Sequence, residues 1–159
     1  MGFDVLIQYS ILTDDWRKEI DINLKNQISK LQKANIFYKT DAPLECYDNS
    51  IHRVEIYVAL AKNITLTNNG SSPNEDVLKF GKGLICKFGL CKQACKNFIL
   101  LVGVEELKLA YAQTGVHLVL TPKIMDIVFN QLSNIFEAEN PAETLNQAIS
   151  DIGKNWIDG

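Results

Sequence analysis

Residues 54–66 carry the most regular alternation of apolar and polar side chains in the chain. A period of two places alternate residues on opposite faces of an extended strand, whereas a helix would spread the same set around its cylinder. We therefore predict extended chain over 53–67. At about 3.3 Å per residue such a strand exceeds roughly 40 Å, so it either bends near Lys62 or belongs to a long, twisted antiparallel sheet. The apolar set is Val54, Ile56, Val58, Leu60, Ile64 and Leu66.

Three other segments have apolar residues at helical spacing and predict amphipathic helices over about 13–32, 122–137 and 141–156. Thr13 or Asp14 is the expected N-terminal cap of the first helix, and Thr121 and Asn140 are the expected caps of the other two. The middle helix is apolar over most of its circumference and is expected to be buried. The stripes are Trp16, Ile20, Leu24, Ile28 and Leu31; Ile124, Met125, Ile127, Val128, Phe129, Leu132, Ile135 and Phe136; and Leu145, Ile149, Ile152 and Trp156.

Shorter alternating or buried runs predict further strands, and polar runs predict loops. The expected strands cover residues 4–10, 36–38, 84–88, 98–104, 107–111 and 116–120, and residues 68–76 are expected to form a surface loop. Together these elements predict one α+β domain over 1–159, with a long twisted antiparallel sheet packed against two or three amphipathic helices.

Composition and charge limit the classes of function that the chain can have. With 159 residues, 47% hydrophobic and 22% charged, the chain has ordinary globular composition. A net charge of −3 argues against nucleic acid as a partner. No apolar run approaches the roughly 20 residues of a transmembrane segment, and no secretory signal is visible. We expect a cytoplasmic protein, or one exported without a recognisable signal.

Four cysteines are the first candidates for chemistry: Cys46, Cys86, Cys91 and Cys95. Their spacing departs from the close pairs of structural zinc sites, although a metal site or disulfides remain alternatives. In a cytosolic protein reduced thiols are the favoured interpretation. His52 and His117 have no neighbouring nucleophile pattern, and no phosphate-binding glycine loop occurs. We therefore expect no enzyme activity, metal or cofactor.

Five lysines form a basic segment without an acidic residue between Asp76 and Glu105. Such a segment suits anionic lipid headgroups, at about 1 kcal/mol per lysine near a membrane. A solvated face balanced by the acidic C-terminal segment is the alternative. The lysines are Lys79, Lys82, Lys87, Lys92 and Lys96.

The alternating run at 54–66 and the apolar helix near Ile124 resemble the architecture of the tubular lipid-binding (TULIP) superfamily, in particular the small proteins encoded beside clostridial neurotoxins. The resemblance implies a twisted antiparallel sheet around a helix, with an apolar tube for an acyl chain or a partner protein. The expected lining is Val54, Ile56, Val58, Leu60, Ile64, Leu66, Ile124, Val128 and Leu132. A solid core, with a partner protein docked outside, is the alternative because interiors pack without voids.

The segments FDVLIQYSILTDDW and NIFYKTDAP resemble instead the opening strands of Toll/interleukin-receptor (TIR) domains. That resemblance implies self-association or NAD cleavage, with Glu75 as the catalytic candidate. It also requires a helix over 51–62, against the alternation found there.

Overall fold

The computed structural model describes residues 5–7, 12–31, 38–47, 54–66, 70 and 72–158, with side chains omitted at 5–7 and 157–158. Within them a four-stranded sheet has the order β1-β2-β3-β4. The strands are β1 (Val5–Ile7), β2 (Glu55–Ala61), β3 (Phe98–Val104) and β4 (Leu109–Thr114). The α-helices are α1 (Asp14–Leu31), α2 (Pro73–Lys87), α3 (Pro122–Asp126) and α4 (Pro141–Asp158). Short helical turns are η1 (Leu44–Tyr47), η2 (Leu90–Lys92), η3 (Ile127–Gln131) and η4 (Leu132–Glu137).

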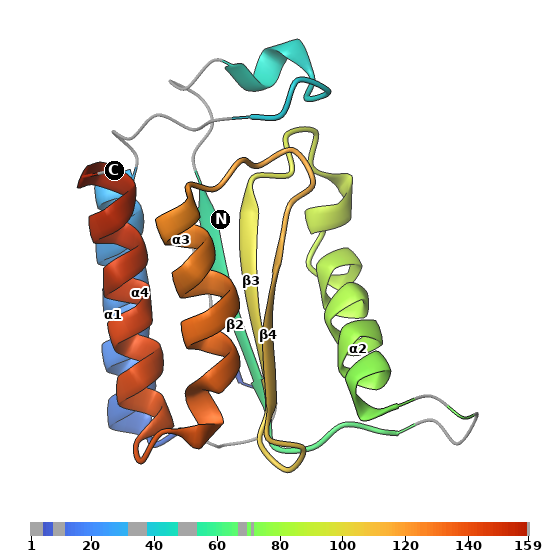
Figure 1. The fold of residues 1–159 in the computed structure, drawn as a ribbon, viewed down its shortest axis with the longest axis vertical. Helices are drawn as coiled ribbons and strands as arrows, with labels where there is room; N and C mark the ends of the chain where they lie inside the picture. The colour runs from blue at the N-terminus through green and yellow to red at the C-terminus, as the bar shows by residue number, and fades with distance from the viewer. Residues whose placement is uncertain are drawn as a thin grey trace.

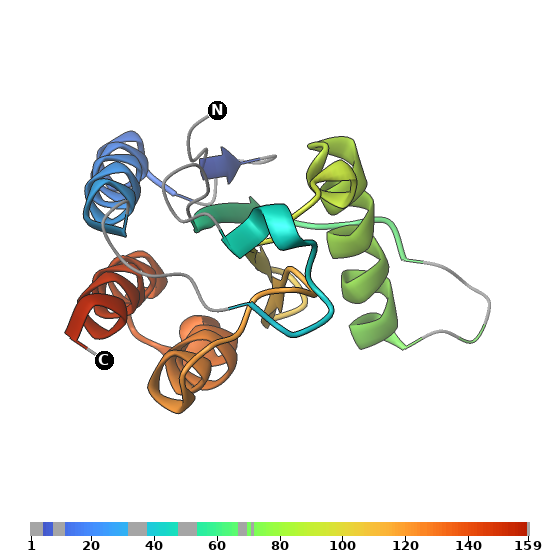
Figure 2. The same cartoon turned by 90° about the horizontal axis from the view of Figure 1, so that it is seen from above.

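The helices cover both faces of this sheet. The group α1, α3 and α4 lies on one side and α2 on the other, so the domain has three layers (Figures 1 and 2). Within the described residues, no helix combines the length and apolar character needed to cross a bilayer.

The α+β class is confirmed, but the mainly antiparallel sheet was wrong. β1–β2 and β2–β3 pair in parallel, and only β3–β4 is antiparallel. Alternation indicates which side chains share a face, and it is the same for either strand direction. Because helices cover both faces, Tyr57, Ala59 and Ala61 are buried as well as the apolar set of β2. A sheet buried on both faces suits parallel pairing.

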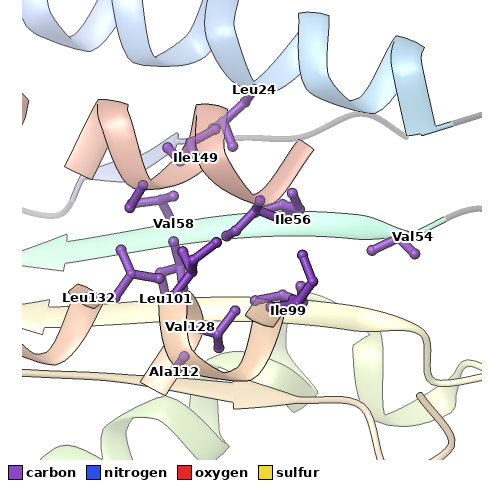
Figure 3. Close-up of a cluster of buried hydrophobic side chains, with 14 of the residues drawn as sticks. Leu24, Val54, Ile56, Val58, Ile99, Leu101, Ala112, Val128, Leu132 and Ile149 are labelled. Atoms are coloured by element: carbon purple, nitrogen blue, oxygen red, sulfur yellow. The ribbon is translucent and has the colours of Figure 1, made fainter. Parts of the chain in front are cut away.

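The larger core cluster lies between the sheet and α1, α3 and α4 (Figure 3). Leu24 of α1 and Ile149 of α4 meet Val58 of β2, while Val128 and Leu132 lie over β3 and β4. The predicted stripes of α1 and α4 are confirmed as buried, with Trp16 and Trp156 half-buried at their ends. The smaller cluster, under α2, contains Val77, Leu84, Ile85, Leu90, Phe98, Leu100 and Val102.

Several predicted boundaries were wrong. β2 has 7 residues rather than 15, because the chain leaves the sheet after Ala61. The segment 84–88, predicted as a strand, belongs mostly to α2, which starts inside the expected loop where Ser72 accepts a hydrogen bond from Glu75 N at 3.3 Å. Residues 116–120 form only an isolated bridge, between Leu118 and Tyr38. Residues 4, 8–10 and 36–37 of the predicted strands lie outside the described part.

The segment 122–137 is helical as predicted, but it passes from α3 through the π-helical η3 to the 3₁₀ turn η4. Ile124, Ile127 and Val128 are buried, whereas Met125 and Phe129 are exposed. The expectation that the apolar side chains of this segment would be buried was therefore wrong for these two residues. The predicted caps Thr121 and Asn140 are confirmed, and Thr13 is the cap of α1 out of the two candidates Thr13 and Asp14. Each of the three accepts a hydrogen bond from the backbone N–H three residues later.

Candidate functional site

A pocket of about 360 Å³ opens at the edge of the sheet where β2 and β3 end. Ligands of α/β sheets commonly bind at the carboxyl ends of parallel strands. The β3–β4 hairpin and the N-terminal ends of α1 and α4 also lie at this end of the molecule, at the bottom of Figure 1. We call this cavity the edge pocket. Its lining is Leu12, Thr13, Trp16, Leu60, Glu105, Lys108, Ile135, Phe136, Asn140, Pro141, Ala142 and Leu145.

The walls of the edge pocket are mostly apolar. Leu60 near the end of β2 and Leu145 of α4 are buried, and the ring of Phe136 is half-buried beside them. Gly103 makes room for this ring, because a Cβ there would lie 3.1 Å from Phe136 Cζ and 3.0 Å from Leu60 Cδ2. A side chain at 103 would therefore push Phe136 or Leu60 out of its present place.

Two charged residues of the rim come from the β3–β4 hairpin. Glu105 N donates to Ala61 O at 2.9 Å, which continues the β2–β3 pairing past the strand ends. Lys108 N donates to Glu105 O at 3.0 Å and closes the turn, with Lys108 in the left-handed region at φ 52°. The hairpin thus holds a carboxylate and an ammonium side chain on one side of the edge pocket.

The N-terminal ends of α1 and α4 supply the other polar rim groups. Thr13 Oγ1 accepts from Trp16 N at 3.2 Å, and Asn140 Oδ1 accepts from Glu143 N at 3.2 Å. Both side chains are thereby engaged in capping. Helix N-terminal ends carry partial positive charge, which Asp14, Asp15 and Glu143 offset in the first turns. An apolar pocket with this mixed rim suits an apolar group that carries a polar or zwitterionic end.

The nine residues predicted to line an apolar tube lie in different parts of the structure. Seven belong to the larger core cluster, and of these only Leu60 also lines the edge pocket. Ile64 packs against the opposite cluster, and Leu66 is 43% exposed. The seven are Val54, Ile56, Val58, Leu60, Ile124, Val128 and Leu132.

The five predicted lysines lie along α2 and the loop after it. Lys79, Lys82, Lys87 and Lys92 are exposed. Lys96 is half-buried, and its Nζ donates to Gln93 O at 2.8 Å. Sequence reasoning missed the edge pocket itself. The position of Glu105 directly after a buried strand was the available signal.

The interpretation of all four cysteines as reduced thiols was wrong for Cys46 and Cys95. These two form a disulfide, with Cα atoms 5.4 Å apart, between η1 and the loop before β3. The pair lies in the larger core cluster, which explains how residues so distant in sequence meet. Cys86 and Cys91 are free. Across the described ranges, no three His, Cys, Asp or Glu side chains gather closely enough to hold a metal ion.

His117 lies at the same end as the disulfide, and its Nδ1 is 3.6 Å from Asp41 Oδ1. That separation exceeds a hydrogen bond, and the Nδ1 atom is buried without a partner. His52 lies outside the described residues.

The fold defines a small α+β domain. Comparison with family models then identifies the family: residues 9–108, more than half of the chain, match MOLO1, Modulator of levamisole receptor-1. The chain belongs to this family. Comparison with curated proteins finds no match.

Three solved structures share the fold at 12–16% sequence identity. The protein BA42 from Bizionia argentinensis has a TM-score of 0.61 at 16% identity, over 95% of this chain and 85% of that one. The N-terminal domain of a P. gingivalis protein has 0.58 at 16%, over 94% and 79%. The N-terminal domain of cg2496 from Corynebacterium glutamicum has 0.55 at 12%, over 96% and 79%.

These matches do not confirm the tubular lipid-binding resemblance. They give no support to the TIR resemblance either, and its required helix over 51–62 is replaced by β2 in the described part of that segment. Glu75, its catalytic candidate, is exposed in the first turn of α2.

Proposed function

We propose that the protein is a non-catalytic binding domain that associates with a partner protein through the edge pocket. The observation that carries this proposal is the pocket's composition, with an apolar wall from four separate segments and charged groups at one side. Interfaces are commonly centred on an apolar side chain that fills such a pocket inside a polar rim.

The family description directs the choice of partner. It names a modulator of a receptor, and a modulator acts by binding and shifting the populations of receptor states. The Cys46–Cys95 disulfide supports a place of action outside the reducing cytoplasm, because disulfides persist in oxidising compartments. We therefore propose a receptor exposed to such a compartment as the partner, and no cofactor.

The proposal can be tested by applying the purified protein to the outside of cells that express a levamisole receptor. We expect the levamisole-activated current to change. Trp16→Lys, which places a charge at the pocket wall, should reduce the effect at least several-fold. Ile22→Lys is the matched control, since Ile22 is on the same helix, 57% exposed and outside the pocket.

Circular dichroism and thermal melts should first establish that both variants fold. An unchanged current with the wild-type protein would contradict a receptor partner. Equal activity of the two variants would contradict the edge pocket as the contact surface.

A lipid ligand is the second candidate function, and the volume and apolar wall of the edge pocket favour it. Small-molecule pockets are commonly about 300–1,000 Å³ and mostly apolar. Native mass spectrometry of the protein, before and after organic extraction, should then reveal an acyl-lipid mass that extraction removes. The absence of any bound mass would contradict a lipid ligand, and association with a partner protein would be the one proposal left.

The lysines of α2 and η2 extend this candidate to an anionic surface. These four lysines, Lys79, Lys82, Lys87 and Lys92, are all exposed, and they lie at the α2 layer rather than at the edge pocket. Binding to anionic vesicles should weaken in Lys79→Gln/Lys82→Gln and fall with added salt. Equal binding to neutral vesicles would contradict a role for these charges.

A further inference from the structure

The two free cysteines, Cys86 and Cys91, lie at the end of α2. Cys86 is exposed in the last turn of α2, and Cys91 is half-buried in η2. The hydrogen bond that the Cys86 thiol makes to Cys91 is the largest of the influences that raise the pKa of Cys86. The geometry agrees, because η2 packs against α2 and so holds Cys91 near Cys86.

The backbone between them reverses the chain. Phe88 N donates to Leu84 O at 2.9 Å and Gly89 N to Cys86 O at 3.1 Å, which closes the end of the helix. Gly89 has φ 76°, the left-handed conformation that commonly reverses the chain after a helix. Leu90 follows, 1% exposed in the smaller core cluster, and anchors η2. The turn thus brings η2, and Cys91 with it, back against the end of α2 without strain at a non-glycine residue.

Positive charge surrounds the pair. Lys82 lies one helical turn before Cys86, Lys87 follows it, and Lys92 follows Cys91. All three lysines are exposed. The charge of Lys92 acts on Cys86 in the direction that lowers its pKa, against the larger effect of the hydrogen bond. This surface attracts an anionic reagent more strongly than a cationic one.

We propose that Cys86 and Cys91 are a reversible redox site that closes to a second disulfide by exchange with an anionic low-molecular-weight disulfide of the glutathione class. The exposed Cys86 thiolate attacks one sulfur of the reagent and releases one glutathione thiolate. The Cys91 thiolate then attacks the Cys86 sulfur of the mixed disulfide and releases the second. The two cysteines lose two electrons and two protons, and the reagent is reduced to two thiols.

Peptide mapping tests the closure. The protein is reduced mildly, so that the buried Cys46–Cys95 bond survives, and is then treated with oxidised glutathione, quenched and digested with trypsin. Lys87 separates the two cysteines, so closure joins the peptides GLICK and FGLCK. We expect this linked pair from the wild-type protein. Cys91→Ser should stop at a stable glutathione adduct on Cys86. Such an adduct, a disulfide-linked dimer or unreacted thiols in the wild-type protein would overturn the proposal.

Matched lysine variants test the preference for an anionic reagent. Lys82→Gln/Lys92→Gln should react several-fold more slowly with oxidised glutathione, but no more slowly with the cationic disulfide cystamine. Lys18→Gln/Lys154→Gln makes the same change of net charge at exposed positions of α1 and α4 and should leave both rates unchanged. Equal slowing with both reagents, or none, would overturn the charge preference while leaving the closure result intact.

Discussion

Gly81 shows how a single residue sets the distance between α2 and the sheet. A Cβ at Gly81 would overlap the hydroxyl of Tyr111, which reaches across from β4. That hydroxyl donates to Val77 O at 3.1 Å, so β4 is tied directly to α2. Glycine at this position therefore lets α2 pack closely against Tyr111, although glycine lowers the stability of a helix.

Replacing Gly81 with Ala should lower the free energy of unfolding by about 1–3 kcal/mol, because the Tyr111 ring must move. Gly83→Ala is the matched control on the same helix, where a Cβ meets nothing within 4 Å. It should raise stability by about 0.5–1 kcal/mol. Urea unfolding of both variants measures the difference. Similar values for the two would contradict the packing role of Gly81.

The same tyrosine predicts a loss of stability in alkali. Burial raises the pKa of Tyr111 to about 12 from the ordinary value of 10.0. The folded state thus holds the proton more tightly than the unfolded state, so its contribution is complete below pH 10 and is lost as pH rises toward 12. The free energy of unfolding should fall less steeply between about pH 10 and pH 12 for Tyr111→Phe than for the wild-type protein. Equal slopes for the two proteins would contradict the raised pKa of Tyr111.

Between elements, a polar seam joins α1 to α4 at the side of the larger core cluster. Asn23 Nδ2 lies 2.8 Å from Asn146 Oδ1 and 2.9 Å from Ser150 Oγ, while Gln27 Nε2 donates to Asn23 Oδ1 at 2.9 Å. Gln27 also fills the space beside Gly153, where a Cβ would overlap its Oε1. These bonds fix the register in which the two helices pack.

Asn23→Ala should therefore lower the free energy of unfolding by about 1–3 kcal/mol, since it leaves partly buried partners unsatisfied. Asn26→Ala makes the same chemical change at an exposed position of α1 and should stay within about 0.5 kcal/mol of wild type. Thermal and urea unfolding would compare them. A loss at Asn26 as large as at Asn23 would contradict the role of the seam, because Ala favours the helix over Asn at both positions.

At the scale of elements, the sequence predicts helices by their stripes and strands by burial, but not how strands pair. The stripes of α1 and α4 were readable because one face of each meets the core. In α2 the glycines at 81 and 83 interrupt the helical pattern, and the buried face (Val77, Leu84 and Ile85) is narrow. Its start signal, Ser72 followed by Pro73 and Glu75, was present but lay inside a polar run.

Across the whole molecule, the edge pocket and the disulfide lie at opposite ends of the sheet (Figure 1). Neither could be predicted from the sequence. The edge pocket needs segments that span residues 12–145, and the cysteine pairing joins residues 49 positions apart. Both depend on which elements pack side by side, which local patterns do not contain.

Cys46–Cys95 closes a loop of 49 residues, and its removal should lower the free energy of unfolding by about 2–5 kcal/mol. Cys46→Ala/Cys95→Ala tests this, with Cys86→Ala/Cys91→Ala as the control. The loss of the disulfide should also loosen the structure locally. Beside the disulfide, the hydrogen bond from Lys39 N to His117 O at 2.8 Å and the Tyr38–Leu118 bridge hold the same end of the sheet.

Hydrogen exchange separates the local from the global effect. The Lys39 amide should lose protection in Cys46→Ala/Cys95→Ala, while the Glu105 amide, which donates to Ala61 O beside the edge pocket, should keep it under conditions where exchange occurs by local opening. Ligand or receptor binding at the edge pocket should then survive the loss of the disulfide. An equal loss of protection at both amides would mean that the bond acts on the unfolded chain alone, and that the two ends of the domain are not independent.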